Sequence, residues 1–193
     1  MPYWRKSLSR PISIVLIFFI VFIFNNNVFS DTLKFDRVKI ELSEDEEILL
    51  DAQIAFDLNE TISVALKNGV PLTFEIQIKM RKSNAWIWQP NAVEIRLRNE
   101  VRYRPLSGLY EVEILNINDK RMFATKVSAL RYAGQIRDLV LVRRQDLDLK
   151  AEYLVSLDAF LDVKALPLPM RPQAYMSSDW NIEAKPLEWR LRP

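Results

Sequence analysis

Apolar and polar residues alternate over most of the chain after residue 30, and this pattern constrains the fold more than any other feature. Alternation is typical of strands that bury one face, because successive side chains point to opposite sides of a sheet. The clearest examples lie at 48–58, 72–80, 93–103 and 153–163. With three glycines and no cysteine, the chain has neither a Gly-rich phosphate loop nor a disulfide. The core alone must therefore stabilise the domain.

Four further strands are expected, at 33–42, at 110–114, at 136–142 and in the tail around Trp189. The first has a phase slip near Asp36-Arg37, where a β-bulge would restore the register. Around the turn at 105–108, pairing Tyr103 with Tyr110 also places Arg102 opposite Glu111. The sequence thus predicts about eight strands in hairpin order.

Two short inserted helices are expected as well. Asn59 can cap the first, which would end at Asn68-Gly69 and bury Ile62, Ala65 and Leu66. Asp119 is predicted to cap the second, in which Phe123, Val127 and Leu130 share a face. Three prolines at 166–172 cannot continue a ladder. We therefore predict a mainly β fold, an antiparallel β-sandwich of about eight strands with two short inserted helices.

The N-terminus is typical of a secretory signal peptide. Arg5, Lys6 and Arg10 precede an unbroken apolar run at 12–24. As a helix this run would be about 20 Å long, shorter than a hydrocarbon core of about 30 Å. Val28 and Ser30 fit cleavage after residue 30. The segment is rich in Phe and Ile and also fits an uncleaved membrane anchor, but not a lipoprotein anchor, which needs a cysteine.

This leader sets the expected organisation and location. Residues 1–30 are predicted to be a signal peptide or an inner-membrane anchor, and 31–193 a single β-rich periplasmic domain. Three of the 27 basic side chains and no acidic one lie in the leader, so the remainder is nearly neutral. This charge balance gives no support for nucleic-acid binding.

Histidine is absent, which removes the catalytic and zinc-binding arrangements that depend on it. Lysine or carboxylate chemistry remains open, and Asp158 and Asp162 lie on one predicted strand face. A solvent-facing pair is more often there for solubility, and Asp162 is expected to hydrogen-bond the bend that follows it. The acids at 44–47 point apart in a tight turn. We therefore expect no enzyme activity, no cofactor and no metal site.

Four arginines alternate with apolar residues on one predicted strand, namely Arg96, Arg98, Arg102 and Arg104. They would form an outward-facing patch for an anionic lipid headgroup, a polyanion or an acidic protein surface. The alternative is a solvated sheet face, neutralised by acids on neighbouring strands such as Glu75, Glu111 and Glu113.

Trp86 and Trp88 lie in the predicted loop at 83–91. Exposed indoles there could bind a protein partner, stack on a sugar or rest at a membrane interface. The alternative, which alternation favours, is that one indole points inward as a lid over the end of the sandwich. Trp180 and Trp189 are expected to belong to the core.

Several short motifs occur in an order that resembles one family: Leu58-Asn59 before a helix, Lys67-Asn68-Gly69-Val70-Pro71-Leu72, Trp86-Ile87-Trp88, Leu161-Asp162-Val163 with Leu166-Pro167, and Asp179-Trp180-Asn181 with Trp189. The chain after the leader is similar to the proteobacterial domain of unknown function 4390 family (DUF4390). That resemblance implies an exported protein of this size, with no catalytic residues to transfer. It also implies a link to envelope sensing, through a membrane histidine kinase encoded beside family members. The very hydrophobic leader departs from the family pattern.

The expected function is therefore a non-catalytic interaction or ligand-binding module of the periplasm. An envelope-structural role and an enzyme using carboxylate or lysine chemistry are the alternatives. The expected partner is an envelope or inner-membrane protein. Contact with the membrane is expected only through residues 1–30, if they are not cleaved.

Overall fold

The computed structural model describes residues 33–86 and 88–193. The predicted leader, its cleavage site and Ile87 lie outside the described residues. The strands are β1 (Leu33–Leu42), β2 (Glu47–Phe56), β3 (Leu72–Lys82), β4 (Val93–Arg104), β5 (Leu109–Ile114), β6 (Asp119–Phe123), β7 (Gln135–Arg143), β8 (Tyr153–Leu161) and β9 (Leu187–Leu191). The α-helices are α2 (Glu60–Lys67), α3 (Lys126–Ala133) and α4 (Arg171–Met176). In the described part of the chain, no helix combines the length and apolar character needed to cross a membrane.

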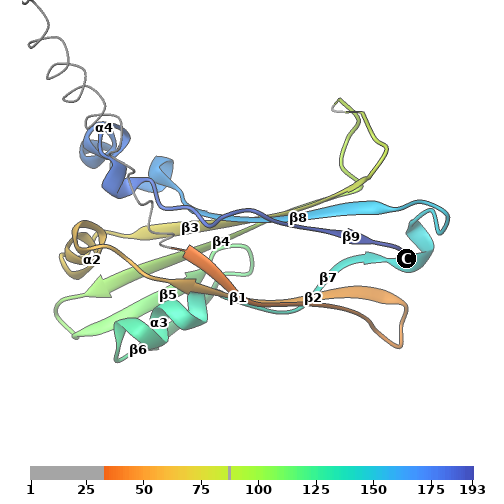
Figure 1. Ribbon diagram of the computed structural model, residues 1–193. Helices are drawn as coiled ribbons and strands as arrows, with labels where there is room; N and C mark the ends of the chain where they lie inside the picture. The colour runs from red at the N-terminus through yellow and green to blue at the C-terminus, as the bar shows by residue number, and fades with distance from the viewer. Residues whose placement is uncertain (1–32, 87) are drawn as a thin grey trace, which may run out of the picture. The chain divides into compact units, whose positions relative to one another are not determined.

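The strands form two antiparallel sheets that lie in two layers (Figure 1). Sheet A has the order β1-β2-β7, and sheet B has the order β6-β5-β4-β3-β8-β9. The predicted mainly β, antiparallel sandwich is confirmed. Within the described residues there are nine strands and three α-helices, one more of each than the sequence predicted.

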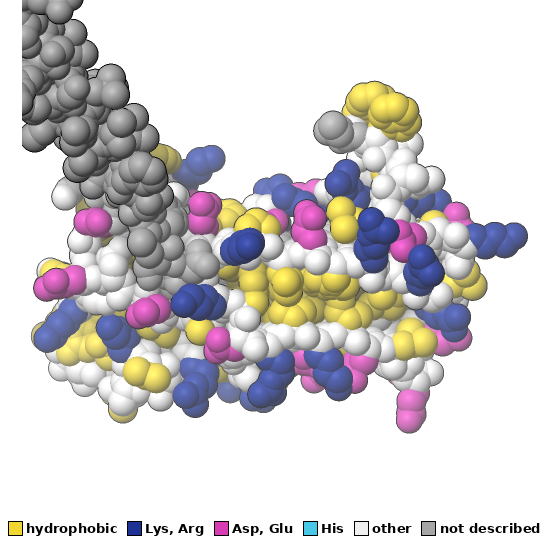
Figure 2. All heavy atoms as spheres, in the orientation of Figure 1, with side chains coloured by type: hydrophobic (Ala, Val, Ile, Leu, Met, Phe, Trp, Pro, Cys, Tyr) yellow, Lys and Arg dark blue, Asp and Glu magenta, His cyan; other side chains and the backbone are white. Residues whose placement is uncertain are grey.

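The core lies between the inner faces of the two sheets. In sheet B the inward positions of β3 and β8 are almost completely buried, and in sheet A those of β2 are buried in the same way. Each fully buried aliphatic or aromatic side chain contributes about 1.5–3 kcal/mol relative to exposure. Figure 2 shows a band of hydrophobic side chains at the surface along the side of the molecule, between the two layers. The core therefore needs no disulfide.

Several local predictions are confirmed to the residue. The register of β1 on β2 shifts between Phe35 and Arg37, as expected for the bulge. Tyr103 pairs with Tyr110 and Arg102 with Glu111 across β4 and β5. Asn59 caps α2, its side chain accepting a hydrogen bond from the Ile62 N–H at 2.9 Å.

The prediction that Asp119 caps a helix is wrong. Asp119–Phe123 is strand β6, which pairs with β5, and Thr125 caps α3 instead. The Asp119 carboxylate accepts a hydrogen bond from the Tyr132 hydroxyl at 2.7 Å, which holds the pKa of Asp119 below its usual value. The helical spacing of Phe123, Val127 and Leu130 was misleading, because Phe123 ends β6 and the other two residues lie in α3. Pairing with β5, which a local pattern does not reveal, determines the outcome.

Helix α3 is fastened to both sheets at its C-terminal end. The buried Asn99 side chain on β4 donates a 2.6 Å hydrogen bond to the Ala133 carbonyl. The Ile54 N–H on β2 donates to the Gly134 carbonyl at 2.8 Å. A Cβ on Gly134 would lie only 2.1 Å from the Ile54 oxygen, so this close approach requires glycine. The position of α3 is thus set by β2 and β4 together.

The proline-rich segment after β8 leaves the ladder, as predicted, and forms short helical turns ending in α4. Asp162 caps the first turn by accepting a hydrogen bond from the Lys164 N–H at 3.0 Å, which confirms its expected role at the bend. Trp180 is buried and Trp189 is half-buried against the core, as predicted. The tail also bonds to α2, where the Thr61 hydroxyl donates to the Asp179 carboxylate at 2.9 Å.

Candidate functional site

The loop between β3 and β4 carries Trp86 and Trp88 at its tip. Their side chains are 65% and 78% exposed. The two indoles stack on each other, with ring centroids 5.2 Å apart and planes within 10°. Figure 2 shows hydrophobic side chains gathered at the end of this loop, which projects from the sheets. The expectation that one indole points inward is therefore wrong, because each ring covers its neighbour and not the core.

Hydrogen bonds hold this loop at its base and near its tip. The Ser83 N–H donates to the Glu152 carbonyl at 2.8 Å, and the Ala92 N–H donates to the Met80 carbonyl at 2.7 Å. Nearer the tip, the Gln89 N–H donates to the Trp86 carbonyl, and the Gln89 side chain accepts from the Trp86 N–H. The indoles thus project from an ordered turn.

The four arginines of the predicted patch all lie on the outward face of β4 in sheet B. Each has a carboxylate partner. Arg96 bonds Glu94 at 2.7 Å and Arg102 bonds Glu100 at 2.9 Å, both along the same strand. Arg98 bonds Asp162 at 2.9 Å, and Arg104 forms two hydrogen bonds with Glu111 at 2.8 and 3.1 Å.

These pairs have electrostatic consequences. The hydrogen bond from Arg104 lowers the pKa of Glu111, and the hydrogen bond from Arg96 lowers the pKa of Glu94. Of the acids expected to neutralise this face, Glu75 lies 3.9 Å from Arg98, whereas Glu113 pairs with Lys120. The geometry matches the alternative of a neutralised, solvated sheet face, in which each of these four arginines is paired with a carboxylate.

Asp158 and Asp162 do not form a pair of free carboxylates, because Asp162 bonds both Arg98 and the Lys164 N–H. Glu44, Asp45 and Glu46 lie in the turn between β1 and β2, and Glu47 begins β2 and pairs with Arg143 at 3.5 Å. No cluster of three or more acidic side chains suited to a metal ion occurs in residues 33–86 or 88–193.

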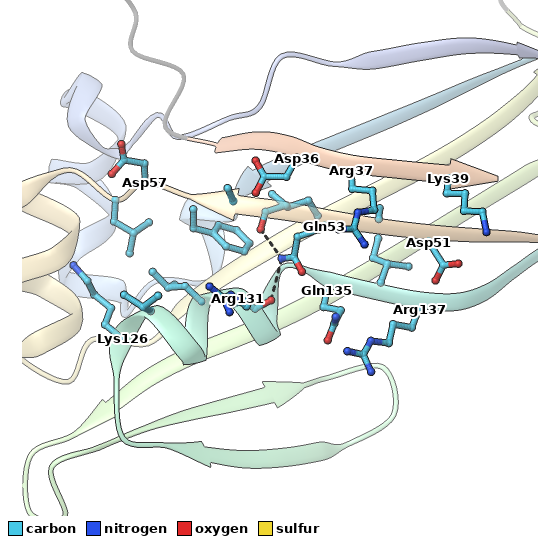
Figure 3. Close-up of a pocket in the computed structure, with 18 of the residues that line it drawn as sticks. Asp36, Arg37, Lys39, Asp51, Gln53, Asp57, Lys126, Arg131, Gln135 and Arg137 are labelled. Carbon is cyan, nitrogen blue, oxygen red and sulfur yellow. Dashed lines mark hydrogen bonds between the residues drawn. The ribbon is translucent and has the colours of Figure 1, made fainter.

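A groove of about 930 Å³, which was not predicted from the sequence, lies on the outer face of sheet A. We call it the sheet A groove. Strand β2 forms its floor, β1 and β7 flank it, and α3 closes one end (Figure 3). Arg37, Gln53 and Gln135 are register partners across the three strands. Their side chains therefore follow one another across the groove.

Both flanking strands are bulged where they border the sheet A groove. On β1 the bulge lies between Phe35 and Arg37, and on β7 the register shifts opposite Asp51. Asp138 in the second bulge has a φ of 47°, a left-handed conformation that is costly for a residue with a side chain. The Asp51 carboxylate stabilises it by accepting the Asp138 N–H at 3.0 Å. Bulges redirect side chains and are frequent beside functional sites.

Four cations that line the sheet A groove form no ion pair with any described residue: Arg37, Lys126, Arg131 and Arg137. In Figure 3 the Asp57 carboxylate lies at the upper left, Asp36 lies beside Arg37, and Asp51 lies between Lys39 and Arg137. The predicted bulge at Arg37 was the one available signal for this site. The other cations are scattered in the sequence and meet only in the fold.

Comparison with known proteins identifies a family and no individual relative. The family model described as Domain of unknown function (DUF4390) matches residues 30–190. No curated protein matches the chain, and no solved structure matches it. The matched range extends from just before β1 to the last strand, β9, and so includes both sheets, the tryptophan loop and the sheet A groove. The chain therefore belongs to the DUF4390 family.

Proposed function

We propose that this protein is a non-catalytic interaction module of the cell envelope, which binds a protein partner through Trp86 and Trp88. The observation that carries the proposal is the exposed, stacked indole pair on a hydrogen-bonded loop. Tryptophan is enriched among residues that dominate binding energy, each typically contributing about 2 kcal/mol or more. Prior ordering of the two rings reduces the entropy lost on binding.

The charges around the loop favour a protein over an anionic lipid surface. Lys82 at the end of β3 is paired with Asp148 at 3.0 Å. Arg190 and Arg192 are both paired with Glu152, at 3.2 and 3.1 Å. A surface that docks on anionic lipid relies on unpaired basic residues beside its hydrophobic anchors. These three cations beside the loop are engaged, whereas Arg81 on β3 forms no ion pair with a described residue, and the main remaining attraction is aromatic.

Location in the periplasm is part of the proposal and rests on the predicted leader. Within the envelope, the family resemblance supplies a membrane sensor histidine kinase as a candidate partner. Binding without catalysis is consistent with a chain that has no histidine or cysteine and whose Asp162 is occupied by Arg98.

The test is capture of partners by the full-length tagged chain, cross-linked in its native envelope and quantified by mass spectrometry. Trp86→Ala with Trp88→Ala should reduce capture of the specific partner by about 30-fold or more, which corresponds to the roughly 2 kcal/mol of a single interface tryptophan. The melting temperature should stay within a few degrees, because both side chains are exposed. Tyr175→Ala, which removes another exposed aromatic side chain on α4, is the matched control and should leave capture unchanged.

Two results would contradict this function. Undiminished capture by the folded double variant would place the interaction surface elsewhere. Loss of binding to phospholipid vesicles, with no change in any protein partner, would show that the loop is a membrane anchor.

A further inference from the structure

The sheet A groove differs from the tryptophan loop in place and in chemistry. Its guanidinium groups come from β1, α3 and β7, whereas Trp86 and Trp88 project from the β3–β4 loop. Arg37, Arg131 and Arg137 are exposed and have no carboxylate partner among the described residues. Guanidinium groups recognise planar carboxylates through paired hydrogen bonds. Four aspartates also line the groove, and one of them, Asp51, accepts the Asp138 N–H. A ligand with several carboxylates would therefore complement the three guanidinium groups.

Apolar and amide side chains also line the groove, and they add a second requirement for its ligand. The half-buried Ala55 and the exposed Val127 line the groove together with the cations. Between them, the Gln53 amide donates to the carbonyls of Ile54 and Arg131, which leaves its oxygen free to accept. Gln135 has no side-chain hydrogen bond among the described residues. The groove can therefore contact apolar groups and amides as well as carboxylates.

The form of the groove indicates a chain-like ligand. Most of the side chains that line it are exposed or half-buried, whereas sites for small molecules surround most of the ligand surface. Its lining on β2 and just beyond runs from Asp51 to Asp57, about 20 Å at roughly 3.3 Å per residue. That length accommodates about six residues of extended peptide. A peptide has a backbone amide at each residue, and its side chains can be acidic or apolar.

We propose that the sheet A groove binds an extended acidic peptide segment of another protein, whose carboxylates pair with Arg37, Arg131 and Arg137. The backbone amides of the peptide pair with Gln53 and Gln135, and its apolar side chains rest on Ala55 and Val127. This inference is independent of the tryptophan loop. The two sites could engage one partner or two.

Fluorescence anisotropy with the purified full-length chain tests the proposal. The probe is a labelled peptide of alternating Glu and Ala, about eight residues long to span the groove. Arg37→Gln with Arg137→Gln should weaken its binding by about tenfold or more. The control is Arg96→Gln with Arg104→Gln on sheet B, which changes the net charge equally and should alter binding less than about twofold.

Further measurements identify the ligand class and keep the test decisive. Raising NaCl from about 50 to about 500 mM should weaken binding, because the contacts are between exposed charges. Backbone NMR of the unmodified chain should show peptide-induced shifts on β1, β2 and β7, so the test does not rely on a variant that folds. Trp86→Ala with Trp88→Ala should bind the peptide normally.

Four outcomes would overturn the proposal. The first is absence of saturable binding up to about 1 mM peptide, the weakest affinity worth assigning to a site. The second is equal loss in both arginine pairs, which would indicate attraction by net charge alone. The third is equally effective competition by inorganic phosphate, which would indicate a site for any small anion. The fourth is equal binding of a matched peptide of alternating Lys and Ala.

Discussion

The outer faces of the two sheets carry arginines in different states. On sheet B, Arg96, Arg98, Arg102 and Arg104 form a regular row, and every member is paired with a carboxylate. On sheet A, Arg37 and Arg137 form no such pair with a described residue and border a groove. The sheet B row is easily recognised in the sequence, but its charges are already neutralised. The sheet A cations are scattered in the sequence, but their charges remain available to a ligand.

The difference teaches that the number of cations on a strand does not measure the charge available to a ligand. On β4 the pairs arise because Glu94 and Glu100 share the outward face with the arginines, while β5 and the end of β8 supply Glu111 and Asp162. In sheet A the bulges shift the register, and Asp51 is used to hold the Asp138 backbone. Neighbouring strands therefore decide which charges remain.

The largest expected effect concerns the joint that keeps α3, and with it Arg131, beside the sheet A groove. Gly134→Ala should lower the free energy of unfolding by about 3 kcal/mol, because the new Cβ would collide with the Ile54 carbonyl. Gly108→Ala, at a φ of 69° with nothing within 4 Å, should cost only about 1 kcal/mol. Denaturant unfolding measures both. Equal losses would mean that the close approach of α3 to β2 is not rigid.

A smaller difference in stability is expected between removing a paired arginine and removing an unpaired one. Arg98→Ala should cost about 1 kcal/mol, because it leaves the largely buried carboxylates of Asp162 and Glu75 without their partner. Arg137→Ala should change stability by less than about 0.5 kcal/mol. Thermal unfolding of the two variants gives the comparison. If Arg137→Ala were as destabilising as Arg98→Ala, the distinction between the two faces would not hold.

The smallest effect is a dependence on pH. The hydrogen bond from Arg104 lowers the pKa of Glu111 in the folded protein, so in acid the unfolded chain binds the proton more readily. The stability from this pair is complete above the unfolded pKa of about 4.3 and is lost as pH falls through the folded pKa. The Glu111→Gln variant should therefore melt at a lower temperature than the unmodified protein at neutral pH, and the difference should shrink in acid, as the pH falls below about 4.3.

The matched control for that measurement is Glu44→Gln in the exposed turn before β2, which removes an acid without an ion pair among the described residues. It should leave the melting temperature unchanged at both pH values. A gap for Glu111→Gln that persists undiminished in acid would show that the amide fails for steric reasons and not through lost charge.

The local sequence pattern determined much of the fold. Alternation placed the strands, the phase slip at Asp36 located a bulge, and the side-chain oxygen of Asn59 identified the start of α2. The predicted pairing of Tyr103 with Tyr110 is correct because a short turn leaves few alternative registers. These features depend on neighbours in the chain, which a single sequence contains.

The rest depended on contacts between distant segments. Asp119 has the sequence context of a helix cap, but it pairs with β5 and so belongs to a strand. The two tryptophans stack on each other outside the core, and the alternation of apolar and polar residues cannot reveal this contact. The sheet A groove is assembled from β1, β2, α3 and β7, so its members share no motif. The candidate site was thus only half predictable: the tryptophan loop could be found from the sequence, and the groove could not.

The position of β3 at the middle of sheet B has a consequence for how the chain folds. Its neighbour β4 follows directly and can pair with it early, but the other neighbour, β8, comes only after β5, β6, α3 and β7. Closing such a long loop costs entropy before any contact compensates for it, and folds dominated by distant pairings form slowly. Until β8 arrives, one edge of β3 has unpaired backbone groups beside apolar side chains. During synthesis, the most buried strand of the finished sheet is therefore the most exposed to aggregation.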